Sequence, residues 1–597
     1  MGKNETYWNG LEQYQAEPVF AKGQKDEFTE DLPIVEGFSE ESLGVKSNRR
    51  DFLKLFGFGL TAAALTACVE KPVRKAVPYV VKPENVTPGV ASWYATTCQG
   101  CAANCGLLVK SREGRPIKVE GNDMHGMSRG GTCAVGQASV LNLYDSERLK
   151  APRGPEGKMS WNGAIDEIGS KLNGLKSSGG KVVVVSNTLT SPTSKNVIKG
   201  FLGQFPNAKH VAYDSNSSYA LAKVHSSSEA LVVPTFRFDK ADVIVSIDAD
   251  FLGNWISPVQ YTKDYISGRK VDQDNPKMSK HIHMESRMSL TGSNADLRVP
   301  MKPSQLYGAV SSLYKKLTGG AGVDFDAAGN VVDRAARELK KAGSGKSLVV
   351  CGINDVAIQA VVKAINEHLG NYGSSIDMDA PSYQAQGNDM DMMDFVKNVA
   401  SAKAVIFLDE ANPVFDYMAG SKLAEGLAKV GLTVAFTPKD NETSTKCKYV
   451  LAQTHSMEAW DDANPAKGHY SIQQPLVRPI FGSMQWQDVM LRWSGSSQKY
   501  YDYLRSNWET AMYPLQANVR GPRKFWESMV RDGYFMTGSA PAPEAPVVEA
   551  PVAEGDSPEE PVAAMTTDVS SSVAKINAAF KKGGAGMELV VYEKHYM

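Results

Sequence analysis

The sequence predicts an α/β protein in which a small cysteine-bearing N-terminal domain precedes two doubly wound, Rossmann-like units. Four of the seven cysteines fall between residues 98 and 133. From about residue 159 to about residue 500, short apolar runs alternate with helical stretches. Alternation of this kind is typical of parallel sheets with helices on both faces. A Pro/Ala/Glu-rich stretch over residues 539–570 predicts a disordered linker near the C-terminus.

Length and charge exclude some classes of protein. A chain of 597 residues corresponds to about three or four domains. The 65 basic and 66 acidic side chains nearly cancel, to a net charge of −1. Without a basic excess we expect no nucleic-acid partner. No apolar stretch reaches the roughly 20 residues that a membrane-spanning helix needs.

An export signal is predicted over residues 47–68, after an extension that covers residues 1–46. Arg49 and Arg50 form a twin-arginine pair, followed by the short apolar run Phe56–Ala67. The run ends in Leu-Thr-Ala before Cys68, which has the form of a lipobox. An amphipathic helix start or a plain cleavage site is the alternative. We therefore expect twin-arginine export to the periplasmic face of the bacterial inner membrane, with acyl chains on Cys68 in the lipid bilayer.

The cysteine domain is expected over residues 93–150, after an extended proline-bearing linker at 69–92. Cys98, Cys101, Cys105 and Cys133 are spaced C-x2-C-x3-C-x27-C, and four thiolates are the ligands of a [4Fe–4S] cluster. A structural zinc site, or a site that has lost its metal, is the alternative. A disulfide framework fits poorly, because such scaffolds are short and rich in cysteine. Apolar alternation on both sides of Glu113-Gly114 predicts a hairpin in this domain.

The two α/β units are expected over residues 151–340 and 341–538, followed by the linker and a strand-containing tail at 571–597. The tail strand is predicted at Met587–Tyr592. The other predicted strands are Val182–Val185, Val243–Ile247, Ile282–Met284, Leu348–Val350, Ala404–Leu408, Thr433–Phe436 and Tyr449–Leu451. The predicted helices between them include Trp161–Leu175, Pro303–Leu317 and Asp355–Leu369.

The cysteine spacing and several short motifs together resemble the molybdopterin oxidoreductase superfamily. The motifs are Gly114–Asn122, Arg129–Cys133, Ala241–Val245, Ala411–Val414, Glu458–Trp460 and the Gly468, Ser471, Gln473, Pro475 series. The resemblance implies a [4Fe–4S] domain ahead of α/β domains that hold a bis-pterin molybdenum cofactor. With its long extension before the twin arginines, the chain as a whole is similar to the molybdopterin-like/iron–sulfur large subunit of alternative complex III, a membrane quinol-oxidising complex. In that family, ferredoxin-type iron–sulfur sites follow the molybdopterin-like half of the subunit. We therefore expect this chain to be a split or truncated form of such a subunit.

Three departures from the family pattern argue against a bound molybdenum bis-molybdopterin guanine dinucleotide. Functional members carry Lys or Arg where this chain has Val135. Asp248 and Asp250 follow the strand end where the family has small residues, and carboxylates would repel a pyrophosphate. No cysteine lies between Cys133 and Cys351 to serve as a molybdenum ligand. Serines in 214–218 could offer oxygen, but turn residues are the simpler interpretation. We therefore assign no catalytic and no pterin-binding residue.

The remaining candidate residues are most simply interpreted as having structural roles. His281 and His283 share one face of a strand without a third ligand nearby in sequence, so a structural role is favoured. His125 could tune the cluster through a hydrogen bond, although a plain loop histidine is the simpler interpretation. Cys351 and Cys447 are predicted to be buried apolar residues.

The leading hypothesis is a structural or electron-relaying subunit docked on a membrane quinol-oxidising complex. Its expected partners are ferredoxin-type iron–sulfur, cytochrome c and integral membrane subunits. One alternative is an active molybdenum-dependent polysulfide or thiosulfate reductase. The other is a scaffold that holds no cluster.

Overall fold

The computed structural model describes residues 87, 89–226, 231–271, 276–537, 569–583 and 586–592. The predicted export signal with Arg49 and Arg50, the lipidation site Cys68, and the linker up to residue 568 lie outside these residues. All described residues belong to one unit, Asn85–Met597. Within them, no helix is both long and apolar enough to span a membrane.

The cysteine domain is a three-stranded antiparallel sheet with one helix. Strands β1 (Ala91–Thr97), β2 (Gly106–Arg112) and β3 (Arg115–Gly121) pair in that order, and α4 (Ala134–Leu143) follows. The predicted hairpin is confirmed. Its two turn residues, Glu113 and Gly114, both have positive φ, 52° and 75°, as a tight two-residue turn requires.

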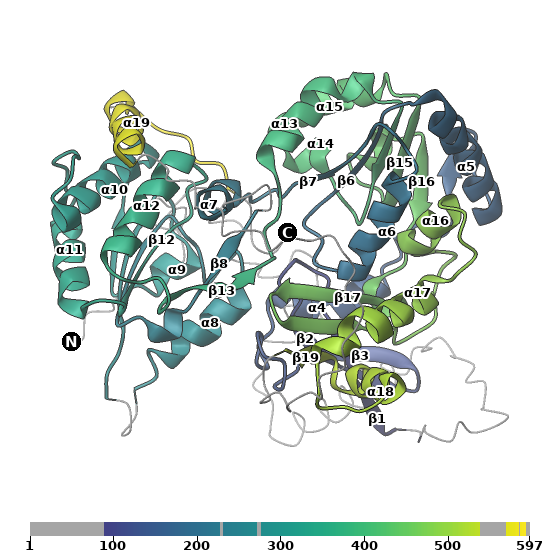
Figure 1. Cartoon of the computed structure of the whole chain (residues 1–597), viewed down its shortest axis with the longest axis horizontal. Helices are drawn as coiled ribbons and strands as arrows, with labels where there is room; N and C mark the ends of the chain where they lie inside the picture. Colours follow the sequence, from purple (N-terminus) through teal and green to yellow (C-terminus); the bar gives the residue numbers. More distant parts are fainter. Residues whose placement is uncertain are drawn as a thin grey trace, which may run out of the picture. The chain divides into compact units, whose positions relative to one another are not determined.

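The larger parallel sheet has strands from two distant parts of the chain (Figure 1). Its order is β5-β4-β16-β15-β14-β6-β7, and the five strands from β16 to β7 run parallel. Both faces are buried: Val182 and Val184 point into one apolar cluster, Val183 and Val185 into another. The strands are β4 (Arg153–Gly154), β5 (Gly157–Lys158), β6 (Val182–Ser186), β7 (Ala208–Ala212), β14 (Ala404–Phe407), β15 (Leu432–Thr437) and β16 (Tyr449–Ala452). The helices are α5 (Trp161–Ser178), α6 (Pro192–Leu202), α13 (Asp389–Asn398), α14 (Pro413–Asp416), α15 (Gly420–Leu427) and α16 (Trp486–Trp493).

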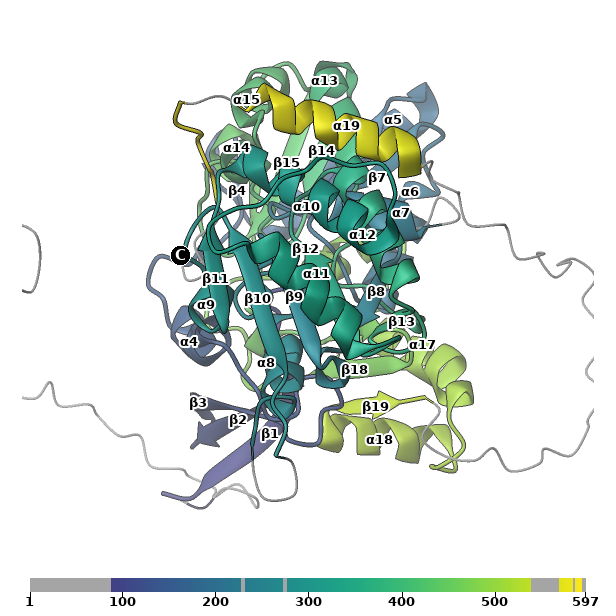
Figure 2. The ribbon, with the colours of Figure 1, turned by 90° about the vertical axis from the view of Figure 1, so that its left-hand side faces the viewer.

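The smaller parallel sheet has the order β11-β10-β9-β12. Figure 2 shows α10, α11 and α12 in front of its strands, and these helices share one core with Val243, Val245 and Ile247. The opposite face packs against Tyr261 and Tyr265 of α8. The strands are β9 (Val243–Ile247), β10 (Lys280–Glu285), β11 (Leu297–Pro300) and β12 (Ser347–Cys351). The helices are α7 (Tyr219–His225), α8 (Pro258–Ser267), α9 (Leu290–Ser293), α10 (Pro303–Thr318), α11 (Val331–Ala342) and α12 (Val356–His368).

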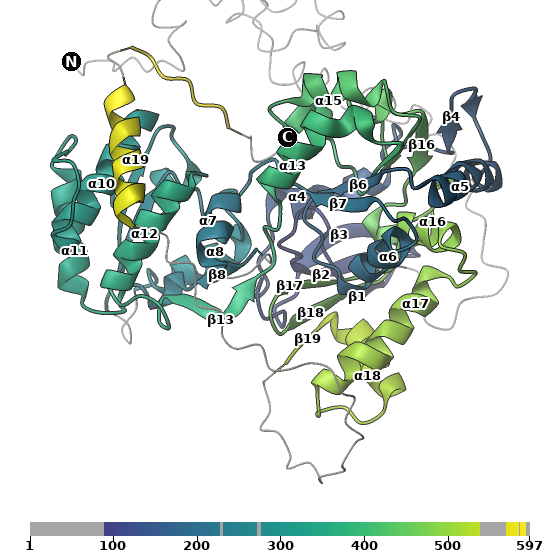
Figure 3. The same ribbon diagram turned by 45° about the horizontal axis from the view of Figure 1, so that its top comes forward.

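An antiparallel five-stranded sheet, β19-β18-β17-β13-β8, carries the chain between the two parallel sheets (Figure 3). The chain leaves the larger sheet, passes through β8, builds the smaller sheet and returns through β13. The strands are β8 (Val233–Phe236), β13 (Ile376–Ser382), β17 (Asp461–Ala466), β18 (His469–Gln473) and β19 (Tyr534–Met536). Helices α17 (Tyr500–Asn507) and α18 (Pro522–Asp532) pack beside it.

Two doubly wound units are therefore confirmed, but the boundary expected near residue 340 is wrong. Strand β12 belongs with β9, while β14 pairs with β6. The smaller unit is an insertion in the larger one. Local patterns fix where strands occur, but the pairing of buried parallel strands is decided by partners far along the chain.

The C-terminal tail also differs from the prediction. Its described part begins with helix α19 (Val569–Lys582), and Met587–Tyr592 belongs to no strand among the described residues. Its apolar alternation was the reason to expect a strand. Tyr592 of this segment instead contacts Arg287 in the loop after β10, and Glu588 accepts a hydrogen bond from the Ser304 amide of α10.

Candidate metal centre

The four cysteines of the predicted cluster come from one loop and one helix start. Cys98 directly follows β1, and Cys101 and Cys105 lie on the loop before β2. Cys133 is the N-cap of α4, where its thiol accepts a hydrogen bond from the Gly136 amide at 3.4 Å. The Cys98 amide donates to the Cys105 carbonyl at 2.9 Å, which closes the loop on itself.

The structure brings these thiols together. A Cβ atom placed on Gly136 would lie 3.8 Å from Cys98 Sγ and 3.9 Å from Cys133 Sγ. Cys98, Cys105 and Cys133 also share one small apolar cluster. The Gly100 amide donates to Cys98 Sγ at 3.4 Å, a contact that stabilises a thiolate when a metal is bound.

The electrostatics of the site suit a positively charged inorganic core. Burial, followed by the charge of neighbouring Cys101, raises the pKa of Cys98 to about 12. Burial also raises the pKa of Cys105. Metal binding must therefore displace thiol protons. In the described part of the chain, no group of three or more His, Cys, Asp or Glu side chains is placed to hold a metal ion.

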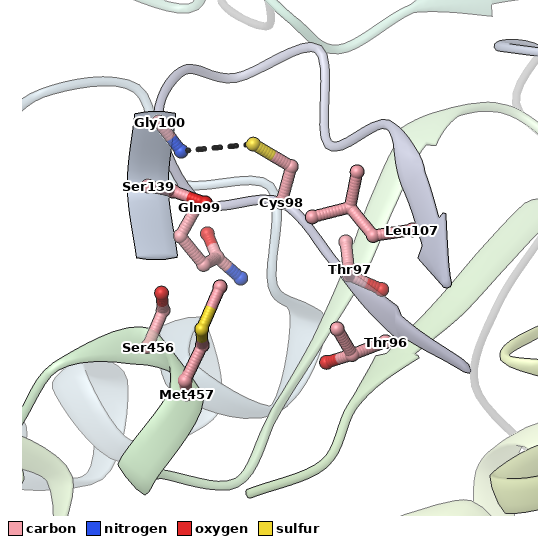
Figure 4. A pocket seen from close by; sticks show the side chains of 9 residues that line it. All are labelled: Thr96, Thr97, Cys98, Gln99, Gly100, Leu107, Ser139, Ser456 and Met457. Carbon is pink, nitrogen blue, oxygen red and sulfur yellow. Dashed lines mark hydrogen bonds between the residues drawn. The ribbon is translucent and has the colours of Figure 1, made fainter. Parts of the chain in front are cut away.

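A small cavity lies beside Cys98 (Figure 4). Its volume is about 20 Å³, enough for roughly one water molecule and not for an organic ligand. The side chains of Cys98, Ser139 and Met457 approach it from three separate segments. The cluster loop is thus covered by the turn at residues 455–458.

Three of the contacts between the cysteine domain and the α/β units are made by Asn104, Arg129 and Arg148. Thr190 Oγ1 donates to Asn104 Oδ1 at 2.5 Å, and Asn104 has the positive φ of 45° that asparagine tolerates. Arg129, four residues before Cys133, forms an ion pair with Asp264 of α8. Sequence reasoning did not identify Asn104 or Asp264, since neither residue belongs to a recognised motif.

The third contact is a buried ion pair between Arg148 and Glu458. The two side chains are 1% and 0% exposed, and they form two hydrogen bonds of 2.5 and 3.1 Å. Burial alone would raise the pKa of Glu458, but hydrogen bonds from Arg148 and from the Ile480 and His455 amides outweigh burial and lower it. The Glu458–Trp460 motif therefore anchors the cysteine domain.

His125 is not hydrogen-bonded to a cysteine. Its Nδ1 lies 3.2 Å from the Ser128 amide and 3.0 Å from the Ser128 hydroxyl, and that hydroxyl accepts from the Gly106 amide at 3.2 Å. Burial, with His469 nearby, lowers the pKa of His125 to about 4. The residue packs the loop beneath β2, in line with the simpler interpretation.

The carboxyl edge of the smaller sheet is acidic. A cavity of about 210 Å³ lies there, between the ends of β9 and β12, lined by Asp248, Asp250, Glu285 and Arg287 among others. Ligands of open α/β sheets bind at this kind of switch point. Three carboxylates against one guanidinium disfavour a pyrophosphate. Val590, Val591 and Tyr592 of the tail also line the space.

The carboxyl edge of the larger sheet is acidic as well. Burial raises the pKa of Asp409, and burial together with the charge of Asp409 raises that of Glu410 to about 7. The Asn412 side chain, part of the family motif, instead binds Glu442 and Thr443. Asn187 Oδ1, Gln453 Oε1 and Thr454 Oγ1 are buried without a hydrogen-bond partner. This edge could thus still accept hydrogen bonds or water.

The other candidates have structural roles. His281 and His283 both hydrogen-bond to Ser246, and His283 Nε2 lies 2.9 Å from Glu285. Cys351 is buried and Cys447 is partly buried. Val135 is 38% exposed, and its Cγ1 atom would lie 3.2 Å from a Cβ on Gly100. It adjoins the cluster loop without supplying a charge.

Comparison with known proteins agrees with this geometry. Residues 91–145 match the molybdopterin oxidoreductase Fe4S4 domain, a range that contains all four cysteines. Over 510 residues the chain is 25% identical to a menaquinone reductase, molybdopterin-binding-like subunit, of Nitratidesulfovibrio vulgaris. That match covers 75% of this chain and 72% of the relative.

Two further similarities concern a shorter segment and the fold. The chain is 29% identical over 148 residues to the molybdopterin-containing subunit of an arsenate respiratory reductase from Shewanella, which covers 22% of this chain and 17% of that protein. The solved structure of acetylene hydratase from Pelobacter acetylenicus superposes with a TM-score of 0.53, at 13% identity, over 74% of each chain. The second similarity concerns the fold alone.

Proposed function

We propose that this chain, which is similar to the molybdopterin oxidoreductase Fe4S4 domain over residues 91–145 and to a menaquinone reductase subunit over most of its length, is a cluster-bearing subunit of a quinone-linked oxidoreductase and has no molybdenum site of its own. One observation carries the proposal. The four cysteines converge in a domain of the Fe4S4 type, while both parallel sheets end in carboxylates where a dinucleotide would bind.

Without a molybdenum site, such a chain can still transfer electrons through its cluster. A [4Fe–4S] cluster, when bound, accepts and gives up one electron. The chain's own residues hold and insulate it: Cys98 and Cys105 lie within the fold, whereas Cys101 is exposed. Electrons would pass most directly through the Cys101 side, because tunnelling requires close approach of a partner.

We place the subunit in a complex of the alternative complex III type, on the periplasmic face of the inner membrane. The similarity to a subunit of a menaquinone reductase supports a membrane complex as the setting. The predicted twin-arginine signal and the lipobox at Cys68 support the location. Ferredoxin-type, cytochrome c and integral membrane subunits are the proposed partners.

Metal quantification on the chain purified from its native membrane tests this proposal. We expect about four iron atoms and less than about one tenth of a molybdenum atom per chain. One molybdenum per chain would reject it. Absence of iron, with no electron paramagnetic resonance signal on reduction, would favour the cluster-free scaffold.

A second candidate, a molybdenum-dependent reductase, is favoured by the three unpartnered polar atoms at the edge of the larger sheet. Polysulfide or thiosulfate reduction with an artificial donor distinguishes it. The activity should disappear when cells grow with tungstate.

A further inference from the structure

A strap made of α19 and residues 586–592 lies across the inserted unit. Helix α19 packs on α10 and α12, with Val573 and Ile576 at 2% and 0% exposure in the core of that unit. Asn577 bonds to Ser311, and Phe580 packs on Phe325 with ring centres 5.0 Å apart. The helix thus anchors the strap on the smaller sheet's outer layer.

Beyond the helix, the strap reaches the first turn of α10. Lys302 Nζ donates to the Gly586 carbonyl at 2.8 Å. The Glu588 carboxylate accepts from the Ser304 amide at 2.8 Å and from the Ser304 hydroxyl at 2.5 Å. The hydroxyl and amide bonds from Ser304 lower the pKa of Glu588. An anion therefore already occupies the positive end of this 16-residue helix.

The strap ends over the cavity at the switch point. The Tyr592 ring lies 4.3 Å from the guanidinium of Arg287, a cation–π distance. Arg287 is also 3.7 Å from Asp250. It is the one Lys or Arg that lines this cavity in the described part of the chain. Glu588 and Tyr592 thus contact the α10 N-terminus and Arg287, respectively, at the carboxyl edge of this sheet.

We propose that residues 586–592 are a built-in occupant of the switch-point cavity, which masks the α10 N-terminus and Arg287 and so excludes phosphate-bearing ligands from the inserted unit. The inference rests on the proposed function, because it supplies a reason why this half of the molecule takes no dinucleotide. Covalent attachment through α19 gives the strap a high local concentration that a free ligand would have to exceed.

Hydrogen exchange tests the strap without reference to catalysis. The full chain is compared with one that stops after Gly583, which keeps α19. We expect exchange of the Ser304 amide to rise at least tenfold in the shortened chain, while amides of α12 stay protected. Glu588→Lys should have the same effect, and Leu589→Ala should have none, because Leu589 is 87% exposed. Unchanged exchange at Ser304 would overturn the proposal.

Pyrophosphate binding tests the masking. Asp248→Asn removes one repelling carboxylate, and the variant is prepared with and without residues 584–597. We expect pyrophosphate to bind at least tenfold more tightly to the shortened variant. Equal affinity, or no binding to either form, would overturn the masking. Molybdenum content of the full chain is measured separately, so failure of this inference and failure of the proposed function give different results.

Discussion

At the scale of single residues, the four cysteines of the cluster motif differ in their exposure to solvent. Cys105 is buried, Cys98 and Cys133 are partly buried, and Cys101 is exposed. The three remaining thiols of the chain are Cys68, Cys351 and Cys447. Of these, Cys351 and Cys447 lie far from the motif, in the α/β units, and Cys447 packs beside the core of the larger sheet.

Cys101→Ser should therefore abolish the cluster. A serine oxygen is a poor ligand for iron, and Cys101 is exposed, so the fold should tolerate the change. We expect iron and acid-labile sulfide to fall by at least half and the resonance signal of the reduced cluster to disappear. Cys447→Ser is the matched control and should keep full iron. Full iron in Cys101→Ser would show that the ligand set is wrong.

A second residue-scale feature is the carboxyl pair Asp461 and Asp462. Ser191 Oγ lies 2.8 Å from one carboxylate and 2.5 Å from the other, and no salt bridge reaches either in the described residues. Lys195, whose ammonium bonds to Gln386, is the neighbouring cation. Burial, followed by the charge of Asp462, raises the pKa of Asp461 to about 7.

This pair predicts a pH dependence of stability. An acid with a raised folded pKa keeps a proton that the unfolded chain loses, so its stabilisation is lost as pH rises from about 4 to 7. Between pH 5 and 8, the free energy of unfolding of Asp461→Asn should fall by roughly 1–3 kcal/mol less than that of the parent protein. Anaerobic denaturation at several pH values measures it, with exposed Glu156→Gln as control. Parallel curves for Asp461→Asn and the parent would contradict the prediction.

At the scale of elements, the cysteine domain depends on contacts made by side chains rather than on a shared sheet. Arg148 follows α4, and Glu458 lies on the turn before β17. Their ion pair is almost fully buried. Removing one partner leaves a charge with no solvent and no counterion, which is the costly case.

Glu458→Ala should accordingly destabilise the protein by about 3–5 kcal/mol. Arg148→Met with Glu458→Leu, which removes both charges, should cost less than Glu458→Ala. Chemical denaturation of the three proteins gives the comparison. If the double variant proved the least stable, the pair would contribute more than its desolvation cost, contrary to this expectation.

At the scale of the whole molecule, the inserted smaller sheet contacts both the cysteine domain and helix α19. The smaller sheet is inserted between β8 and β13, and α19 returns to it from the C-terminal part. Arg129 and Asp264 join this insertion to the cysteine domain. The described residues, all within Asn85–Met597, therefore form one folded unit, and we propose that this unit is exported.

Membrane attachment gives a test at this scale. If Cys68 is acylated, Cys68→Ser should move the protein from the membrane to the soluble periplasmic fraction of cells that lack the partner subunits. Arg49→Lys with Arg50→Lys should keep it in the cytoplasm. Fractionation and immunoblotting measure both. A Cys68→Ser protein that stayed on the membrane without partners would contradict lipidation.

The sequence by itself predicted the four cysteines as cluster ligands, and it determined the α/β class and most strands of the two parallel sheets. Ligand spacing and hydrophobic period act over a few residues, and β6, β9, β12 and the Glu113-Gly114 turn lie where those patterns predict. Only the tertiary structure decided which strands pair, that the smaller unit is inserted, and that Asn104, Asp264 and Glu458 hold the cysteine domain. It also turned the expected strand at Met587–Tyr592 into a strap. These outcomes depend on contacts between residues far apart in the sequence, which local sequence patterns do not predict.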